Sequence, residues 1–267
     1  VYKRQFEYNV GVNMSTIRNR MTKLNGGTPI SDGPFRNGSM YLTYTNEGMP
    51  IGAFWGYKTD GLIQTQEQLN AVKRADFQPN AELGDVLFVD TNGDGKLDSS
   101  DRCMIGNPIP DIIYGINMGM AWKGFDLNLQ FGGTIGNQIF NAMRYYTYFP
   151  NDITNKDRAL MNYWTPNNTN TDIPRLTATD VNDNDRFSDM YVENGTYFRL
   201  RNAQLGYTLP ASLTQRIKLQ KVRFYVSGQN LFTISSYSGM DPEVGQSSSL
   251  SRGIDLSLIH ISEPTRL

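Results

Sequence analysis

Residues 114–131 read YGINMGMAWKGFDLNLQF, and their pattern is the strongest evidence for the fold in this sequence. Apolar side chains stand at every second position on both sides of Lys123 and Gly124. A period of two places them on one face of a strand and the intervening residues on the other. Two such runs joined by a short connection containing glycine predict a hairpin of two long antiparallel strands. The apolar set is Tyr114, Ile116, Met118, Met120, Trp122, Phe125, Leu127, Leu129 and Phe131; the other set is Gly115, Asn117, Gly119, Ala121, Asp126, Asn128, Gln130 and Gly132.

The same alternation appears in residues 6–14 and, less cleanly, in 197–207 and 222–232. Within 197–207 the apolar positions change face near Arg201 and Asn202, which indicates a β-bulge. Each strand runs about ten residues, close to what a tilted strand needs to cross a bilayer. The face opposite the apolar stripe is mostly Gly, Asn and Gln, which suits a polar lumen. We therefore predict an all-β fold that forms part of a large antiparallel transmembrane β-barrel.

The connections between these strands are unequal in length. The Lys123–Gly124 turn and residues 210–220 are short, whereas 18–111 and 141–196 are long and polar. Outer-membrane barrels have short periplasmic turns and long extracellular loops. With the Lys123 turn on the periplasmic side, the chain is expected to rise over 6–18, 125–140 and 221–233 and to descend over 112–122 and 197–208. Four aromatic residues would then lie near one interfacial girdle: Trp122, Phe125, Tyr207 and Phe224.

Composition excludes several function classes. The 25 Lys and Arg residues against 26 Asp and Glu leave a net charge of −1 without a basic block, so nucleic acid is not an expected partner. A single cysteine, Cys103, and a single histidine, His260, leave almost no material for a disulfide framework, a Cys-rich zinc site or Cys/His and Ser/His catalysis. We expect little helix, no transmembrane helix and no enzymatic activity.

The sharpest local motif is DTNGDGKLDSSD at residues 90–101. Its oxygen-bearing residues recur at the spacing of a twelve-residue calcium loop, with Gly95 at the sharp turn. The last ligand position holds Asp101 in place of the usual bidentate glutamate, and the preceding GDVLFV reads as a strand rather than a helix. A plain Asp/Asn/Gly turn is the alternative. We predict a structural Ca²⁺ site whose ligands are Asp90, Asn92, Asp94, Lys96 through its carbonyl, Asp98 and Asp101.

Other features admit two readings. Arg199 and Arg201 lie in a predicted strand, and four aromatic residues fall in the loop after Phe140: Tyr145, Tyr146, Tyr148 and Trp164. Aromatic loops can stack on sugars or grip a peptide, but packing within the loop or at a barrel rim is the commoner reason. Residues 18–111 allow either no additional crossing or two, because MYLTY and GAFWGY could form an extra hairpin or a loop subdomain. The alternative to a barrel is a secreted, calcium-stabilised β-sandwich binding module.

Five segments resemble the SusC/RagA-type TonB-dependent outer-membrane transporters of Bacteroidetes-like bacteria. They read PIGAFWGYKTDGLIQTQEQL, GDVLFVDTNGDGKLDSSDRCMIGNPIPDIIYGINMGMAWKGFDLNLQF, NYWTPNNTNTDIPRL, YFRLRNAQLGYTLP and VSGQNLFTISSYSGMDPEVG. The resemblance implies the C-terminal part of a plugged barrel of about 22 strands with long extracellular loops. It also implies nutrient uptake of a glycan or oligopeptide, a SusD-like surface lipoprotein as partner, contact with outer-membrane lipid, and energy from the TonB complex through an N-terminal region that this chain lacks.

The resemblance covers most of residues 6–255, so we expect a barrel fragment that lacks the signal peptide, the TonB box, the plug and the closing strand. Residues 1–5 and 256–267 look foreign, because VYKRQ and LSLIHISEPTRL resemble translated sequencing-adapter read-through. On that reading His260 carries no functional meaning.

Overall fold

The computed structural model describes residues 5–148 and 155–256, and the chain divides into two compact units. The sheet unit comprises Val1–Arg18, Pro110–Asn137 and Gly195–Tyr237, and the loop unit comprises Asn19–Ile109, Gln138–Asn194 and Ser238–Leu267. Most of the two end stretches that look foreign, including His260, lies outside the described residues.

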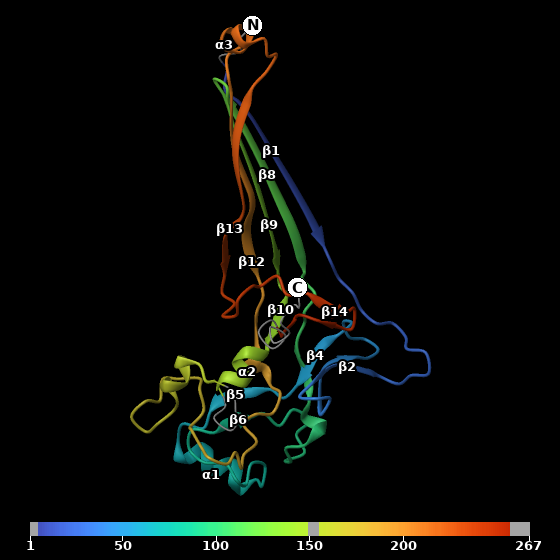
Figure 1. Cartoon of the computed structure of the whole chain (residues 1–267). Helices are drawn as coiled ribbons and strands as arrows, with labels where there is room; N and C mark the ends of the chain where they lie inside the picture. Colours follow the sequence, from blue (N-terminus) through green and yellow to red (C-terminus); the bar gives the residue numbers. More distant parts are fainter. Residues whose placement is uncertain (1–4, 149–154, 257–267) are drawn as a thin grey trace, which may run out of the picture. The chain divides into compact units, whose positions relative to one another are not determined.

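The sheet unit is built on one antiparallel sheet of five long strands in the order β1-β8-β9-β12-β13 (Figure 1). The hairpin is confirmed: Trp122 pairs with Phe125, and the two residues between them have positive φ, 47° at Lys123 and 90° at Gly124. Such a pair of left-handed residues matches the twist of a tight hairpin. The strands are β1 (Glu7–Thr16), β8 (Ile112–Trp122), β9 (Phe125–Ile135), β12 (Tyr197–Thr208) and β13 (Arg223–Ser235).

One expected strand is divided. The strand expected over 125–140 ends at Ile135, and β10 (Gln138–Asn141) belongs to the loop unit. Gly136 between them has φ 90°, a conformation that breaks strand geometry and that glycine adopts without strain. A helical turn, α3 (Ala211–Thr214), and a 3₁₀ turn (Gln215–Ile217) connect β12 to β13.

The loop unit is a subdomain of short strands and turns. The strands described within residues 18–111 belong to small sheets of this unit and not to the long sheet, which favours no additional crossing over two. MYLTY and GAFWGY do pair, as β3 with β4. The sheets are β2 (Ile30–Phe35), β3 (Met40–Thr45), β4 (Ala53–Gly56) and β7 (Cys103–Gly106); β5 (Thr59–Leu62) with β6 (Val86–Phe88); β11 (Val192–Asn194), β10 and β16 (Ile254–Asp255); and β14 (Gln246–Ser248) with β15 (Ser251–Arg252).

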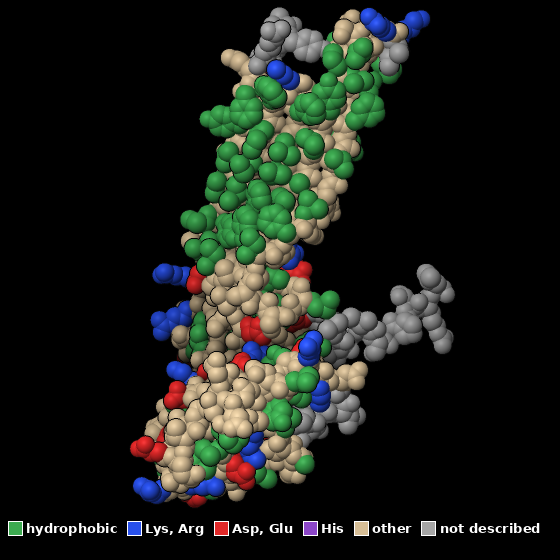
Figure 2. Space-filling model, turned by 90° about the vertical axis from the view of Figure 1, so that its left-hand side faces the viewer, with side chains coloured by type: hydrophobic (Ala, Val, Ile, Leu, Met, Phe, Trp, Pro, Cys, Tyr) green, Lys and Arg blue, Asp and Glu red, His purple; other side chains and the backbone are tan. Residues whose placement is uncertain are grey.

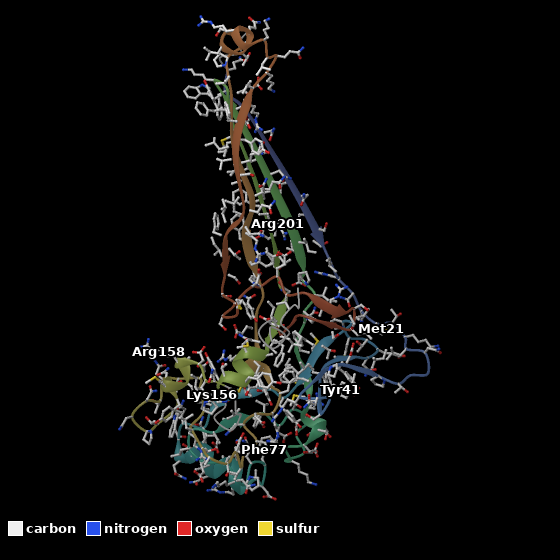
Figure 3. The ribbon with its side chains drawn as sticks, viewed as in Figure 1. Met21, Tyr41, Phe77, Lys156, Arg158 and Arg201 are labelled. Carbon is white, nitrogen blue, oxygen red and sulfur yellow. The ribbon has the colours of Figure 1, made fainter. Side chains whose placement is uncertain are left out.

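Two helices accompany these sheets, α1 (Gln66–Arg74) and α2 (Ala142–Tyr148). Three 3₁₀ turns complete the unit, at Ser99–Asp101, Arg158–Asn162 and Asp189–Tyr191. Its largest core joins strands β2–β4 to β10 and α2, and consists of Phe35, Leu42, Phe54, Phe140, Ala142, Tyr145, Phe187 and Tyr191. A second cluster consists of Leu62, Phe77, Val86, Phe88 and Trp164, with Phe77 labelled in Figure 3. The loop unit therefore has a hydrophobic core of its own.

Candidate functional site: a two-faced sheet and its loop unit

The long sheet separates apolar from polar side chains across its whole width. Register places apolar residues of all five strands in common rows on one face. Val10, Val12 and Met14 of β1 are 56–70% exposed, far more than apolar side chains of a folded core. Figure 2 shows hydrophobic side chains covering this face. Two of the rows are Tyr8, Met120, Leu127, Leu205 and Val226, and Val12, Ile116, Phe131, Leu200 and Phe232.

The aromatic residues expected at one girdle form such a row. Trp122 pairs with Phe125, which pairs with Tyr207, which pairs with Phe224. The Phe125 and Tyr207 rings lie 4.5 Å apart between centroids. Register therefore brings these four rings to the turn end of the sheet, as the alternation predicts.

The opposite face is lined by uncharged amides and small residues. One row is Asn9, Gly119, Asn128, Gln204 and Ser227, and the next is Gly11, Asn117, Gln130, Asn202 and Gln229. Glycines of β8 make room for amides of β1: a Cβ on Gly119 would lie 2.6 Å from the Asn9 side-chain oxygen. This face can donate and accept hydrogen bonds without carrying much charge.

One ion pair on the polar face was not foreseen from the sequence. Arg223 donates to Asp126 through Nε at 3.0 Å and Nη2 at 2.5 Å. This bidentate geometry is the strong form of such a pair. The two residues lie 97 positions apart, so only strand register reveals the contact.

The bulge in β12 is confirmed, because the register shifts between Leu200 and Asn202. Before the bulge, Arg199 belongs to the polar face, where its Nε donates to Thr233 Oγ1 at 2.9 Å. Arg201, labelled in Figure 3, donates to the Tyr197 hydroxyl at 3.1 Å and approaches Gly132. The bulge keeps both guanidinium groups off the apolar face although the alternation changes phase there.

The acidic loop at 90–101 folds around its own backbone. Asp90 accepts from the N–H of Gly93 at 2.6 Å and of Gly95 at 2.8 Å, and the Gly95 bond foremost holds the Asp90 pKa below its usual range. Asp101 is fully buried and accepts from the N–H groups of Thr91 and Asp98. The Ser100 hydroxyl foremost, with its N–H, lowers the pKa of Asp98.

The remaining predicted ligands lie on the outside of this loop. Asn92 accepts from the N–H of Asp94 at 2.8 Å, and Asp94 accepts from the N–H of Lys96 at 2.9 Å. Across the described part of the chain, no group of three or more His, Cys, Asp or Glu side chains is placed to hold a metal ion. Calcium binding by this loop stays a prediction.

Loop packing accounts for three of the four loop aromatics, and Tyr146 is the partly buried one, packed against the largest core. Tyr145 lies in the largest core and Trp164 in the second cluster, and both are buried. Trp164 Nε1 donates to Gln64 Oε1 at 2.8 Å. Tyr148 lies under the guanidinium of Arg144, whose carbon is 5.1 Å from the ring centroid.

A buried polar network, which the sequence did not indicate, holds the loop unit together. Arg175 Nε donates to the fully buried Asp85 at 2.6 Å. Burial opposes the charge on Arg175, but the hydrogen bond and charge of Asp85 keep its pKa raised. The Gln78 side-chain amide donates to the carbonyl of Val86 at 2.9 Å and accepts from the N–H of Phe88 at 3.0 Å. It therefore makes the two backbone hydrogen bonds that an adjacent strand would make with β6. These contacts make the loop unit a fixed structure rather than a set of independent loops.

No described helix is long and apolar enough to cross a membrane. No protein-family model matches the chain. TonB-dependent receptor P3 of Formosa agariphila is 36% identical over 249 residues, covering 91% of this chain and 24% of the receptor. TonB-dependent receptor SusC of Bacteroides thetaiotaomicron is 26% identical over 245 residues, covering 91% of this chain and 23% of SusC.

Solved structures give the same result for the fold. A structure of the RagAB peptide transporter matches with a TM-score of 0.70 and 24% identity, covering 96% of this chain and 26% of that chain. The closed-closed state of the RagAB peptide importer matches with a TM-score of 0.69 and 25% identity. This chain spans about a quarter of the length of these relatives. The chain therefore belongs to the TonB-dependent receptors of the SusC/RagA type.

Proposed function

We propose that this chain forms part of the barrel wall and the extracellular loops of an outer-membrane, TonB-dependent nutrient importer. The two-faced sheet carries the proposal. Its apolar face, with side chains such as Val12 at 70% exposure, suits lipid, and its amide-lined face suits a water-filled or plugged lumen. A soluble β-sandwich would need a second sheet over the apolar face, and the described strands of the sheet unit form only one.

The names of the relatives support a proposal for the cargo and the partners. One relative is named a peptide transporter, which favours an oligopeptide cargo over a glycan. The loop unit, with a core and a buried network of its own, is a rigid surface on which a SusD-like lipoprotein can close. TonB would act through a part of the full-length protein that this chain does not contain.

A matched pair of arginine substitutions in the full-length receptor tests whether the two faces of the long sheet meet lipid and a polar lumen. Met118 lies at the middle of β8 on the apolar face, and its neighbour Asn117 lies on the polar face. Met118→Arg places a cation against lipid at a cost of about 2–4 kcal/mol near the bilayer midplane, whereas Asn117→Arg meets a polar environment. We expect Met118→Arg to lower the folded receptor in the outer-membrane fraction by at least about tenfold, given that cost.

Uptake is measured in the same strains. The receptor gene is deleted and complemented with each variant, and entry of a fluorescent tryptic-casein peptide mixture or a fluorescent maltooligosaccharide mixture is followed with and without a protonophore. Energy-dependent entry of the peptides in the wild type and Asn117→Arg strains supports the proposal. Equal accumulation of the two arginine variants, or entry that the protonophore leaves unchanged, contradicts it.

A further inference from the structure

The connection between β12 and β13 carries three cationic residues and no acidic residue of its own. Residues 209–222 read LPASLTQRIKLQKV, with Arg216, Lys218 and Lys221 and no Asp or Glu. All three cationic side chains are exposed. The segment is nevertheless ordered by its own backbone: the N–H of Leu219 donates to the carbonyl of Thr214 at 3.0 Å, and the N–H of Leu209 to that of Val222 at 2.9 Å. The three cationic residues therefore lie in an ordered segment, residues 209–222, which we call the cap.

Exposed leucines lie among these cations. Leu213 and Leu219 are each 49% exposed in the same cap. A short segment that presents leucine and lysine together to the outside has the composition of an interfacial membrane anchor.

The hairpin turn of β8 and β9 extends this cationic end. The N–H of Thr208 donates to the carbonyl of Gly124 at 2.8 Å, so the turn adjoins the start of the cap. Lys123 Nζ lies 4.4 Å from the centroid of the Trp122 ring. Trp122 and Phe125 are about half exposed and begin the apolar face. Figure 2 shows Lys and Arg side chains gathered at this end of the sheet, next to the hydrophobic face.

The neighbouring acids lie on the other face. Asp126 and Glu7 belong to the polar-face row, and Asp126 pairs with Arg223 and also interacts electrostatically with Lys221 without an ion-pair contact. Within the described residues, no ion pair joins Lys123, Arg216, Lys218 or Lys221 to a carboxylate. The turn end therefore offers four cations next to an apolar, aromatic surface.

We propose that this cationic rim, formed by Lys123, Arg216, Lys218 and Lys221 with Leu213 and Leu219, binds the headgroups of anionic phospholipids. The proposal rests on the proposed function, which places the apolar face in lipid. The phosphodiester groups of these lipids carry the complementary negative charge. The aromatic rings would lie at the boundary of the acyl chains, and the cations next to them would lie at the level of the headgroups. A soluble protein fits less well, because Trp122 and Phe125, which adjoin these cations, begin the apolar face that the proposed function places in lipid.

The test uses the purified full-length receptor in detergent with phosphatidylglycerol or phosphatidylcholine as the probe. Native mass spectrometry counts the lipids retained by the wild type, by R216Q/K218Q/K221Q, and by the control K23Q/K73Q/R74Q, whose three cations are exposed in the loop unit. Each cation near an anionic surface contributes substantially to the free energy of binding, so we expect R216Q/K218Q/K221Q to bind phosphatidylglycerol at least about fivefold more weakly than the wild type. The control variant should bind it like the wild type. Retention by the wild type should fall with added salt.

A charge-conserving variant, R216K/K218R/K221R, separates charge from folding and should retain phosphatidylglycerol like the wild type. Equal retention of the two lipids by the wild type, or equal retention of phosphatidylglycerol by the wild type and R216Q/K218Q/K221Q, overturns the proposal. Photo-crosslinking from position 219 in cells that captures a protein instead of lipid also overturns it. Loss of phosphatidylglycerol by the rim variant with normal peptide uptake supports the rim and leaves the importer assignment standing. Absent uptake with intact rim binding refutes the importer alone.

Discussion

At the residue scale, Gly84 shows how a single missing side chain fixes the loop unit. Its φ is 85°, and a Cβ there would overlap the ring of Trp164, 80 residues away. Glycine is required twice over, by backbone conformation and by the close approach of the indole. Both residues fall in segments quoted above for the family resemblance.

Replacing Gly84 by alanine should destabilise the loop unit more than the same change at Gly61. Both positions have positive φ, at a cost of about 1–2 kcal/mol, but nothing lies within 4 Å of a Cβ at Gly61. Overlap with Trp164 should add about 1–3 kcal/mol at Gly84. Hydrogen exchange of peptides covering 78–88 in the full-length receptor measures the difference; equal protection in both variants would show that Trp164 moves aside freely.

The acidic loop gives a second prediction at this scale. Hydrogen bonds from backbone N–H groups lower the pKa of Asp90 and Asp98, so both carboxylates stay ionised at neutral pH and available to a cation. We expect terbium luminescence from the full-length receptor to report binding that calcium competes away and that D90N/D94N abolishes, while D60N/D76N leaves it intact. Binding no tighter than about 1 mM would make the loop a plain turn.

At the scale of elements, helix α1 begins at a capping motif that is present in the sequence but that a search for strand periodicity does not detect. Thr65 caps the helix by accepting from the N–H of Gln68, and the Gln68 side chain accepts from the N–H of Thr65 at 3.0 Å. This T-x-x-Q pattern is a capping box. Only Leu69 of the helix is buried, so caps matter more here than packing.

Thr65→Ala should therefore loosen α1. Loss of the cap costs about 1 kcal/mol, which corresponds to roughly fivefold faster hydrogen exchange over residues 66–74. Thr65→Ser keeps the hydroxyl and should exchange like the wild type. If the alanine variant also exchanges like the wild type, the tertiary environment rather than the cap holds the helix.

At the scale of the whole molecule, β1 and β13 are the outer strands of the five-stranded sheet. An exposed edge of ten or more residues leaves a row of unpaired backbone groups, which a bilayer does not satisfy. We expect further strands to pair with both edges in the full-length receptor. Hydrogen exchange over 7–16 and 223–235 in that receptor should be as slow as over 125–135; fast exchange along either outer strand would contradict a closed barrel.

Much of the sheet could be predicted from the sequence, because its evidence is local. Alternation in 114–131 predicts the two faces and the hairpin, and the change of phase near Arg201 predicts the bulge that the register shows. Aromatic residues such as Trp122 and Phe125 fall in one row because the strands are paired in the register that the turn sets. The sequence could not pair Asp126 with Arg223, or Asp85 with Arg175, because their partners lie 97 and 90 residues away.

Local sequence is enough to specify the strand period, the turn at Lys123–Gly124, the contrast between apolar and amide-rich faces, and the family resemblance. These depend on the order of neighbouring residues, and a strand turns that order directly into faces. Three features depend on long-range contacts: the long loops fold as one subdomain with its own core, the Gln78 side chain hydrogen-bonds to β6, and the cations after β12 lie beside the aromatic row. Those features arise from burial and strand register, which join residues that the linear sequence keeps far apart.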